Sequence, residues 1–380
     1  MNAKYVIALL LLGLLLAAAG CTQAPPAGTE AGQPTVAKAP VKIGLLAPLS
    51  GDVAPLSLPM VKSVRLALKQ ANAAGGIDGA PIELIEEDGQ CQPKMATTAA
   101  QKLVNVDRVE GIVGGFCSGE SIAMAPVTQA GKVVQISPSS TNPNISGLGE
   151  FVFRVVAHDA VQGQVVVDAI LKKGYAKPAV LYMNNDYGNG WKDVAVARFK
   201  ELGVTPVAVE TFEQSSRDVK TQLTKVKAAG ADVLISISLS AEAPVVLKQL
   251  KELGMNLPVY VGDGATDQAV IDNAGGAAEG MIGVKSKVYD GAEAKAFEEA
   301  YRKEYGEEIG IYAGESYDAF NLLVQGLRAG KRGQELNDWL YTVDYTGASG
   351  RNKFDKNGDV DKLPELFVVK DSKFVEYTEG

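Results

Sequence analysis

Two polar loops on either side of one predicted helix carry the residue types best suited to bind a small charged molecule. The first loop ends at Ser118, where the helix is expected to begin, and the second follows a strand over residues 133–137 and contains Ser139 and Thr141. Backbone N–H groups at a helix N-terminus favour an anion, and the hydroxyl groups add further donors. Small ligands bind at the carboxyl ends of neighbouring strands in open α/β sheets. Residues 114–143 are therefore predicted to form the floor of a cleft for a small anionic or zwitterionic molecule.

Bulk composition limits the classes of protein to which this chain can belong. It has 380 residues, of which 46% are hydrophobic and 22% charged, as in ordinary globular proteins, and the length indicates two domains. The net charge of -8 argues against a nucleic-acid partner. Three cysteines and one histidine argue against a metal site, and the sequence contains no P-loop, full dinucleotide-binding fingerprint or HExxH motif. We therefore expect no metal, no cofactor and no nucleic acid.

The N-terminus has the pattern of an export signal. Its apolar segment, residues 6–19, follows a lysine and is short for a transmembrane helix. The sequence Leu16-Ala-Ala-Ala-Gly-Cys21 resembles a bacterial lipobox, although alanine stands where leucine is usual three places before the cysteine. We predict a lipoprotein signal peptide over 1–20, a flexible tether over 21–40, and a periplasmic or cell-surface protein anchored to a membrane through Cys21. A plain signal peptide is the alternative.

Export also bears on the two remaining cysteines. In an oxidising compartment Cys91 and Cys117 are a natural pair, and their disulfide would tie together two loops beside the cleft. Two separate buried thiols are the alternative. The run Gly115-Phe-Cys117-Ser-Gly119 also resembles a nucleophile elbow, which raises the hypothesis of a cysteine hydrolase. A disulfide would remove that nucleophile, and no motif marks the only histidine, His158, as its base.

Strand and helix patterns predict an α/β fold. Continuous apolar runs such as 41–48 are typical of buried strands, and residues 58–74 have the periodicity of an amphipathic helix. The alternation repeats in two series separated by a strand at 151–156, which predicts parallel sheets with helices on both faces. The other expected strands are 81–87, 111–115, 133–137, 179–183, 206–212, 232–238, 258–262, 281–284, 366–369 and 374–377. The other expected helices are 93–106, 118–130, 160–172, 190–202, 218–229, 241–253, 292–305 and 313–329.

Several of these segments match one protein family in order and spacing. They are Ile43-Gly-Leu-Leu-Ala-Pro-Leu-Ser-Gly51, Ala71-Asn-Ala-Ala-Gly-Gly-Ile77, Cys117-Ser118, Ser137-Pro-Ser-Ser-Thr-Asn-Pro143, Phe153-Arg154 with Asp159 and Gln162-Gly163, Asp186-Tyr-Gly188, and Ala313 with Tyr317-Asp-Ala319. The mature chain resembles the branched-chain amino-acid-binding proteins of ABC transporters, the Leu/Ile/Val-binding type of periplasmic binding protein. This resemblance implies two Rossmann-like lobes with parallel sheets, joined by a three-crossover hinge that closes on a ligand. It implies lobe 1 over 41–157 and 288–362, and lobe 2 over 158–287 and 363–380.

The resemblance also implies roles for individual residues of the cleft floor. Ser118 would bind the carboxylate of an amino-acid ligand, and Ser139 would offer its backbone C=O to the ammonium group. Thr141 would touch both ends of the ligand through its N–H and hydroxyl groups. A simple helix cap at Ser118 and an ordinary turn around Thr141 are the alternatives.

On the facing lobe, the resemblance places a tyrosine and an acid. Tyr187 would line the cleft. Asp263 falls where the family commonly has a glutamate that pairs with the ammonium group, and a loop-capping aspartate is the alternative. Asp159 is expected to be only an N-cap near the hinge.

Two departures from the family bear on which ligand the pocket prefers. Leu56 and Leu239 stand where Leu/Ile/Val-binding proteins have cleft tyrosines, so the pocket is expected to be larger or more apolar. We expect a non-enzymatic protein that captures a branched-chain or larger apolar amino acid and delivers it to an ABC permease. A ligand-sensing subunit of a membrane receptor, or a binder of another small polar solute such as an amide or aromatic acid, is the alternative.

Overall fold

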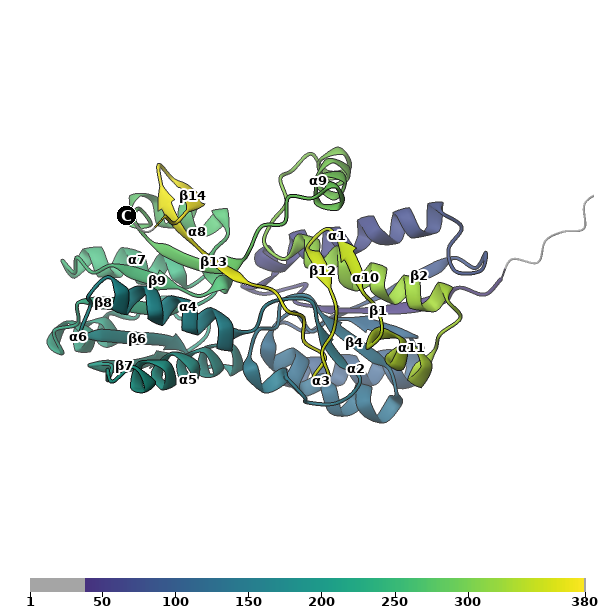
Figure 1. Cartoon of the computed structure of the whole chain (residues 1–380), viewed down its shortest axis with the longest axis horizontal. Helices are drawn as coiled ribbons and strands as arrows, with labels where there is room; N and C mark the ends of the chain where they lie inside the picture. Colours follow the sequence, from purple (N-terminus) through teal and green to yellow (C-terminus); the bar gives the residue numbers. More distant parts are fainter. Residues whose placement is uncertain (1–37, 379–380) are drawn as a thin grey trace, which may run out of the picture. The chain divides into compact units, whose positions relative to one another are not determined.

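The computed structural model describes residues 38–378, which form two large β-sheets covered by helices (Figure 1). The first sheet is entirely parallel in the order β2-β1-β3-β4-β5, and we call this sheet with its helices lobe 1. Its strands are β1 (Val41–Ala47), β2 (Ile82–Asp88), β3 (Gly111–Val113), β4 (Val134–Ser137) and β5 (Val152–Arg154). The inner strands β3 and β4 are buried along their whole length because helices cover both faces of the sheet.

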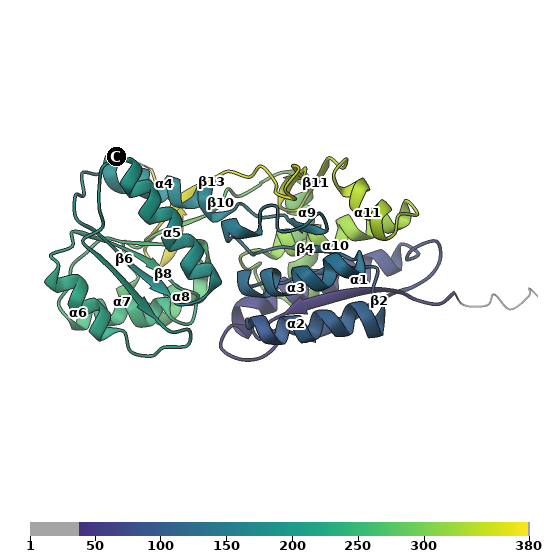
Figure 2. The same cartoon turned by 90° about the horizontal axis from the view of Figure 1, so that it is seen from below.

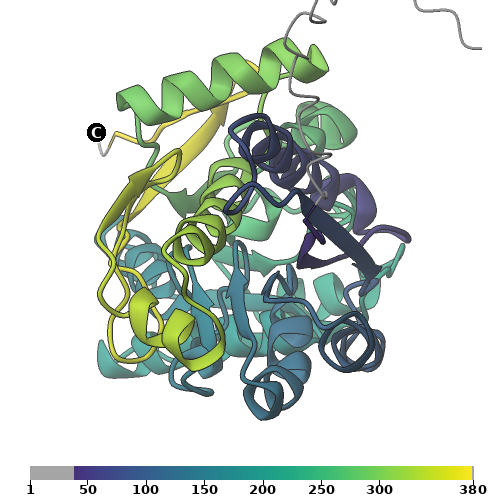
Figure 3. The same cartoon turned by 90° about the vertical axis from the view of Figure 1, so that its right-hand side faces the viewer.

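Successive side chains of the lobe 1 strands point to opposite faces, and a separate apolar cluster fills each face. Leu45 packs with α1 and α10, which lie side by side (Figure 3), whereas Leu46 packs with α2 and α3, which are neighbours (Figure 2). The predicted apolar stripe of α10 is buried at Phe320 and Leu327. The helices of lobe 1 are α1 (Ala54–Ala73), α2 (Pro93–Gln101), α3 (Ser118–Gly131), α9 (Ala292–Tyr305), α10 (Ala313–Arg328) and α11 (Gly333–Leu340).

The second sheet, which with its helices we call lobe 2, is mixed. Its order is β14-β13-β10-β9-β8-β6-β7; at one edge β13 runs antiparallel to β10, and β14 runs antiparallel to β13. Its strands are β6 (Pro178–Met183), β7 (Ala208–Phe212), β8 (Val233–Ile237), β9 (Val259–Val261), β10 (Ile282–Ser286), β13 (Pro364–Lys370) and β14 (Lys373–Glu376). Its helices are α4 (Asp159–Lys172), α5 (Asp186–Glu201), α6 (Lys220–Ala228), α7 (Ala243–Glu252) and α8 (Gln268–Ala274).

Three chain segments connect the lobes, so the predicted three-crossover fold is confirmed. They are residues 155–158, 287–291 and 353–363. Lys362 is half-buried in the third segment and donates hydrogen bonds to the carbonyl of Val155 in the first (2.8 Å) and to the Ser349 hydroxyl (2.6 Å). Burial lowers the pKa of Lys362, and the carboxylates of Glu315 and Asp318 oppose this shift. The exact lobe boundaries stay a prediction.

The largest differences from the sequence-based elements are short pieces. Helix α1 begins at Ala54, four residues before the predicted start, because a proline is tolerated in the first turn of a helix. Helices α8 and α11 and the hairpin β11 (Tyr345–Gly347) to β12 (Gly350–Asn352) were not predicted. Each has eight residues or fewer, too short for a periodic pattern to stand out. Among residues 38–378, no helix is both long and apolar enough to cross a membrane.

Candidate functional site

A cavity of about 290 Å³ lies between the lobes and is lined by residues of both. Five of the seven residues predicted to bind a ligand line it, namely Leu56, Ser118, Ser139, Tyr187 and Leu239. Thr141 and Asp263 are buried within two residues of lining positions. The sequence therefore identified the region of the cavity correctly, and the leucines at 56 and 239 belong to a largely apolar wall with Val53, Met60 and Phe116.

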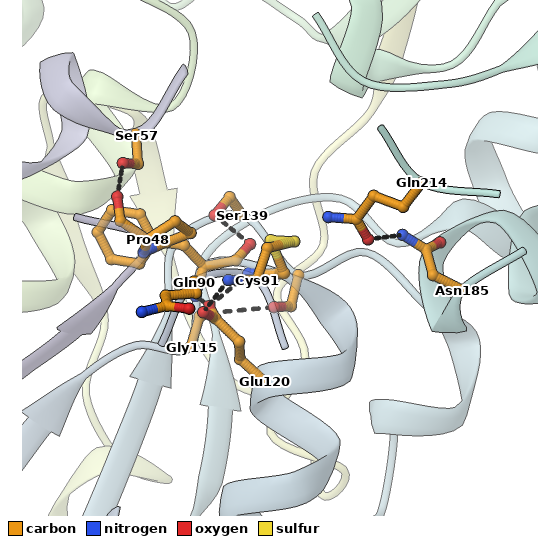
Figure 4. The surroundings of a disulfide bond; sticks show 12 residues. Pro48, Ser57, Gln90, Cys91, Gly115, Glu120, Ser139, Asn185 and Gln214 are labelled. Atoms are coloured by element: carbon orange, nitrogen blue, oxygen red, sulfur yellow. Dashed lines mark hydrogen bonds between the residues drawn. A yellow bond between two sulfur atoms is a disulfide. The ribbon is translucent and has the colours of Figure 1, made fainter. Parts of the chain in front are cut away.

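The predicted disulfide between Cys91 and Cys117 is confirmed, and it forms part of the cavity wall (Figure 4). The two Cα atoms are 5.4 Å apart, and the bond joins the loop after β2 to the start of α3. Because both sulfur atoms are in the bond, Cys117 offers no thiolate for the nucleophile that the hydrolase hypothesis needs.

Glu120 fixes the two loops that carry Cys91 and Cys117. Its carboxylate accepts hydrogen bonds from the backbone N–H groups of Cys91 (2.9 Å), Phe116 (2.9 Å) and Cys117 (3.0 Å). These bonds satisfy N–H groups at the start of α3 and fix the position of Ser118, its first residue. Ser118 is 2% exposed, and its hydroxyl accepts from the backbone N–H of Asn142 (3.3 Å). The N-cap position belongs to Cys117, so the alternative that Ser118 is a simple cap is wrong.

Burial raises the pKa of Glu120 to about 7, although the three N–H groups oppose the rise. In the unfolded chain this carboxyl should titrate near 4.5, so the unfolded state loses its proton first as the pH rises. The stability contributed by Glu120 is therefore fully present below pH 4.5 and is lost as the pH rises through 7. We expect the free energy of unfolding to depend less on pH between 4.5 and 7 in Glu120→Gln than in the natural chain.

Urea unfolding of both proteins at several pH values checks this expectation. Glu120→Gln should also be less stable overall, since its amide offers one acceptor oxygen to three N–H donors. Equal pH slopes in the two proteins would contradict the assignment. His158 contributes the opposite pH dependence of stability, because burial and Arg154 lower its pKa. This contribution is present in both proteins and cancels in the comparison.

The loop after β4 is held from behind by a buried arginine. The Arg154 guanidinium pairs with Asp359 (2.6 Å) and donates to the carbonyl of Asn142 (2.9 Å). The Ser139 hydroxyl donates to the carbonyl of Phe116 (2.8 Å), so it is the backbone carbonyl of Ser139 that remains for a ligand. The Thr141 hydroxyl is buried, makes no well-formed hydrogen bond among residues 38–378, and lies close to the Asp159 carboxylate. The loop after β4 is therefore fixed by side-chain hydrogen bonds and leaves the Ser139 carbonyl and the Thr141 hydroxyl available to a ligand, which distinguishes it from an ordinary turn.

Asp263 lies at the acidic side of the site and is 1% exposed. Its carboxylate accepts from the Tyr187 hydroxyl (3.0 Å), the Gln162 amide (2.8 Å) and the backbone N–H of Gly264 (3.0 Å). Burial raises the pKa of Asp263, and hydrogen bonds from Gln162, Tyr312 and Tyr187 oppose the rise. A cation next to the cavity would offset the cost of burial and favour the ionised form of this carboxyl group.

Asp159 was predicted to be an N-cap, and that prediction is wrong. His158 occupies the N-cap position of α4, and Asp159 is the first helical residue, fully buried. Its N–H donates to the carbonyl of Thr141 (2.8 Å), and its two carboxylate oxygens make no well-formed hydrogen bond in the described part of the chain. Burial and the charge of Asp263 raise the pKa of Asp159, which the Thr141 hydroxyl opposes. Two buried carboxyl groups that interact with each other therefore lie in this region, where sequence reasoning expected one.

Tyr312 is a cavity residue that sequence reasoning missed. It lies just before α10 with a left-handed backbone (φ 59°), and its hydroxyl bonds to Asp263. It stands where the cavity meets a wider groove of about 1160 Å³, and Leu56 also belongs to both. Tyr312 therefore adds an aromatic ring to those of Phe116 and Tyr187 and compensates in part for the leucines. The only signal for Tyr312 in the sequence was its position directly before a predicted helix.

Further polar contacts connect the lobes beside the cavity. The Asn142 side-chain amide donates to the backbone carbonyl of Asp186, at the start of α5. A Cβ atom at Gly119 would lie 2.6 Å from a carboxylate oxygen of Asp186, so a larger residue there would require the Asp186 side chain to move. Arg217 and Asp52 form an exposed ion pair (2.9 Å). The two lobes are thus in direct contact around the site.

Comparison with known proteins identifies relatives along nearly the whole chain. Residues 40–365 match the family model described as "Periplasmic binding protein". An "Amino acid binding protein" of Pseudomonas aeruginosa is 31% identical over 353 residues, covering 89% of this chain and 92% of that protein. The "Leucine-, isoleucine-, valine-, threonine-, and alanine-binding protein" of the same species is 27% identical, covering 84% and 87%. The branched-chain amino acid transporter substrate-binding protein LivJ of Streptococcus pneumoniae, solved with isoleucine, superposes with a TM-score of 0.79 at 28% identity, covering 89% and 100%.

Proposed function

This chain belongs to the periplasmic binding protein family, and from that premise we propose that it captures an amino acid between its lobes and delivers it to an ABC permease. Members of this family are extracytoplasmic solute-binding proteins. The two relatives from Pseudomonas aeruginosa are named for amino-acid binding, which supports the same ligand class here. In this proposal the protein is a carrier and catalyses no reaction.

The observation that carries the proposal is the opposition of charge-binding groups around Thr141. On one side are the helix N-terminus at Ser118 and the Thr141 hydroxyl, which suit a carboxylate. On the other are the buried carboxyl groups of Asp263 and Asp159, whose pKa values are raised by burial and whose ionised forms a ligand cation would stabilise. An α-amino acid carries both groups on one carbon and so satisfies both sides.

The proposed contacts follow from this arrangement. Ser118 binds the ligand carboxylate through its hydroxyl and N–H groups, and Thr141 contacts both charged ends. Ser139 accepts from the ammonium group through its backbone carbonyl. Asp263 provides the compensating negative charge, and Tyr187 orients it through the hydrogen bond of 3.0 Å. Leu56 and Leu239 pack on the ligand side chain.

The alternative ligand classes fit this site less well. An aromatic acid has a carboxylate but no ammonium group, so it would leave the two buried carboxylates uncompensated. A neutral amide would leave the same charges unpaired. A sensing subunit for a membrane receptor would use the same cleft, and co-purification with a permease separates that role from transport.

Binding is tested by unfolding residues 38–380 in the presence of amino acids, aromatic acids and amides. A ligand that binds only the folded state stabilises it by about 2.7 kcal/mol at a hundredfold excess over Kd. We expect one or more L-amino acids to raise the unfolding midpoint. A midpoint raised only by another solute class would refute amino-acid binding.

We also propose that Cys21 is lipidated and anchors the protein to a membrane; this residue lies outside the described residues. Changing Cys21 to serine removes the thiol that accepts the lipid. The expected result is that Cys21→Ser appears in the soluble fraction after export, whereas the natural chain sediments with membranes. Equal sedimentation of the two proteins would count against the anchor.

A further inference from the structure

Besides Asn184, whose amide nitrogen donates to Glu213 (2.9 Å), three side-chain amides line the cavity and belong to neither charged side of the site. Gln92 follows Cys91 in lobe 1, whereas Asn185 and Gln214 come from the loops after β6 and β7 in lobe 2. We call these three residues the amide cluster. In Figure 4, Asn185 and Gln214 lie side by side and apart from the disulfide.

Hydrogen bonds fix which atom of Gln214 is offered to a ligand. The Asn185 side-chain oxygen accepts from the backbone N–H of Gly188 (2.9 Å), so Asn185 is the N-cap of α5. Its amide nitrogen then donates to the side-chain oxygen of Gln214 (3.1 Å). This leaves the Gln214 amide nitrogen as a free donor, and Figure 4 shows it turned toward the disulfide and Ser139. A donor held in this orientation selects a ligand atom that accepts a hydrogen bond.

The local charge indicates that the accepting group is neutral. Within the described residues, no lysine or arginine lines this cavity, and Asp186 lines it close to Asn185. A second carboxylate on the ligand would therefore meet negative charge and no compensating cation. A hydroxyl or carboxamide oxygen can accept a hydrogen bond from the Gln214 amide without the cost of an uncompensated second charge.

The remaining wall is apolar and is formed by residues such as Met60, Phe116 and Leu239. It suits methylene groups between the charged end of the ligand and the amide cluster. We propose that Gln214 is a specificity-determining residue and that the ligand is an amino acid whose unbranched side chain ends in a carboxamide. This inference rests on the amino-acid binding proposed above and narrows it to one class of side chain.

The test is calorimetric titration with L-glutamine, L-glutamate and L-norleucine, which differ at the end of an unbranched side chain. We expect glutamine to bind about tenfold more tightly than either of the others. Gln214→Met removes the donor but keeps the length of the side chain, and should weaken glutamine binding by about 3- to 10-fold, as expected for one neutral hydrogen bond. Norleucine should bind Gln214→Met as tightly as the natural chain, or more tightly.

Gln222→Met is the matched control, because Gln222 donates to the carbonyl of Thr211 and does not line the cavity. It should leave all three affinities unchanged. Glutamine binding that is no tighter than norleucine binding, or that is unaffected by Gln214→Met, overturns the inference. If leucine still binds in that case, the proposed function stands. If no L-amino acid binds the natural chain, both fail.

Discussion

Replacing Asp263 by asparagine should weaken amino-acid binding by a factor of about 30 or more while leaving the protein folded. The change removes the negative charge but keeps a side chain of the same size, next to Tyr187 and Gln162. Removing one partner of a buried, hydrogen-bonded charge pair costs about 2–5 kcal/mol, and each 1.4 kcal/mol is tenfold in affinity. Titration calorimetry with the best amino-acid ligand measures the loss.

The matched control for this experiment is Asp272→Asn, in the exposed part of α8 in the same lobe. It should bind as the natural chain does. Unfolding midpoints of the ligand-free proteins show whether Asp263→Asn folds. Undiminished affinity in Asp263→Asn would mean that the ammonium group is held elsewhere, and Asp159→Asn would then be the decisive variant.

Removing the disulfide should give the largest loss of stability in this chain. A bond between residues 26 positions apart lowers the entropy of the unfolded chain. In the loop-entropy description this raises the free energy of unfolding by about 3.5 kcal/mol. The double variant Cys91→Ser and Cys117→Ser should therefore unfold at a lower urea concentration. It should also bind its ligand more weakly, because both loops contribute to the cavity wall.

Reduction of the natural chain with a thiol provides an independent comparison. Reduced protein should behave as the double variant does, and the double variant itself should be unaffected by the thiol. Equal stability of natural and double-variant proteins would contradict a stabilising bond.

Sequence reasoning placed the cleft correctly because its signals are local. Ser118 marks a helix start, and polar residues such as Ser139 follow a strand, both of which can be read from a few neighbouring residues. The fold followed from the repeated β-α alternation. The pairing of Cys91 with Cys117 needed only an oxidising compartment and two strand-end positions.

The missed features depend on contacts between distant segments. Asp159 looked like a cap because aspartate commonly caps helices, and only tertiary structure shows it buried near Asp263, 104 positions later. Tyr312 reaches the cavity from the loop before α10, more than 190 positions after Ser118 in the sequence. The orientation of Gln214 depends on a hydrogen bond from Asn185, which in turn depends on its bond to Gly188. None of these relations has a signature in the local sequence.

The contact between Asn142 and the backbone of Asp186 has a consequence for how affinity can evolve. It connects the lobes, and the Asn142 side chain does not line the cavity, so the contact favours the closed arrangement whichever ligand is bound. Apparent affinity scales with the fraction of molecules in the binding-competent arrangement. A change at Asn142 should therefore multiply the dissociation constants of all ligands by one factor and preserve their ranking. Strength of capture and choice of ligand can then be tuned at different residues, so a carrier can be adjusted to a scarcer nutrient without becoming selective for another.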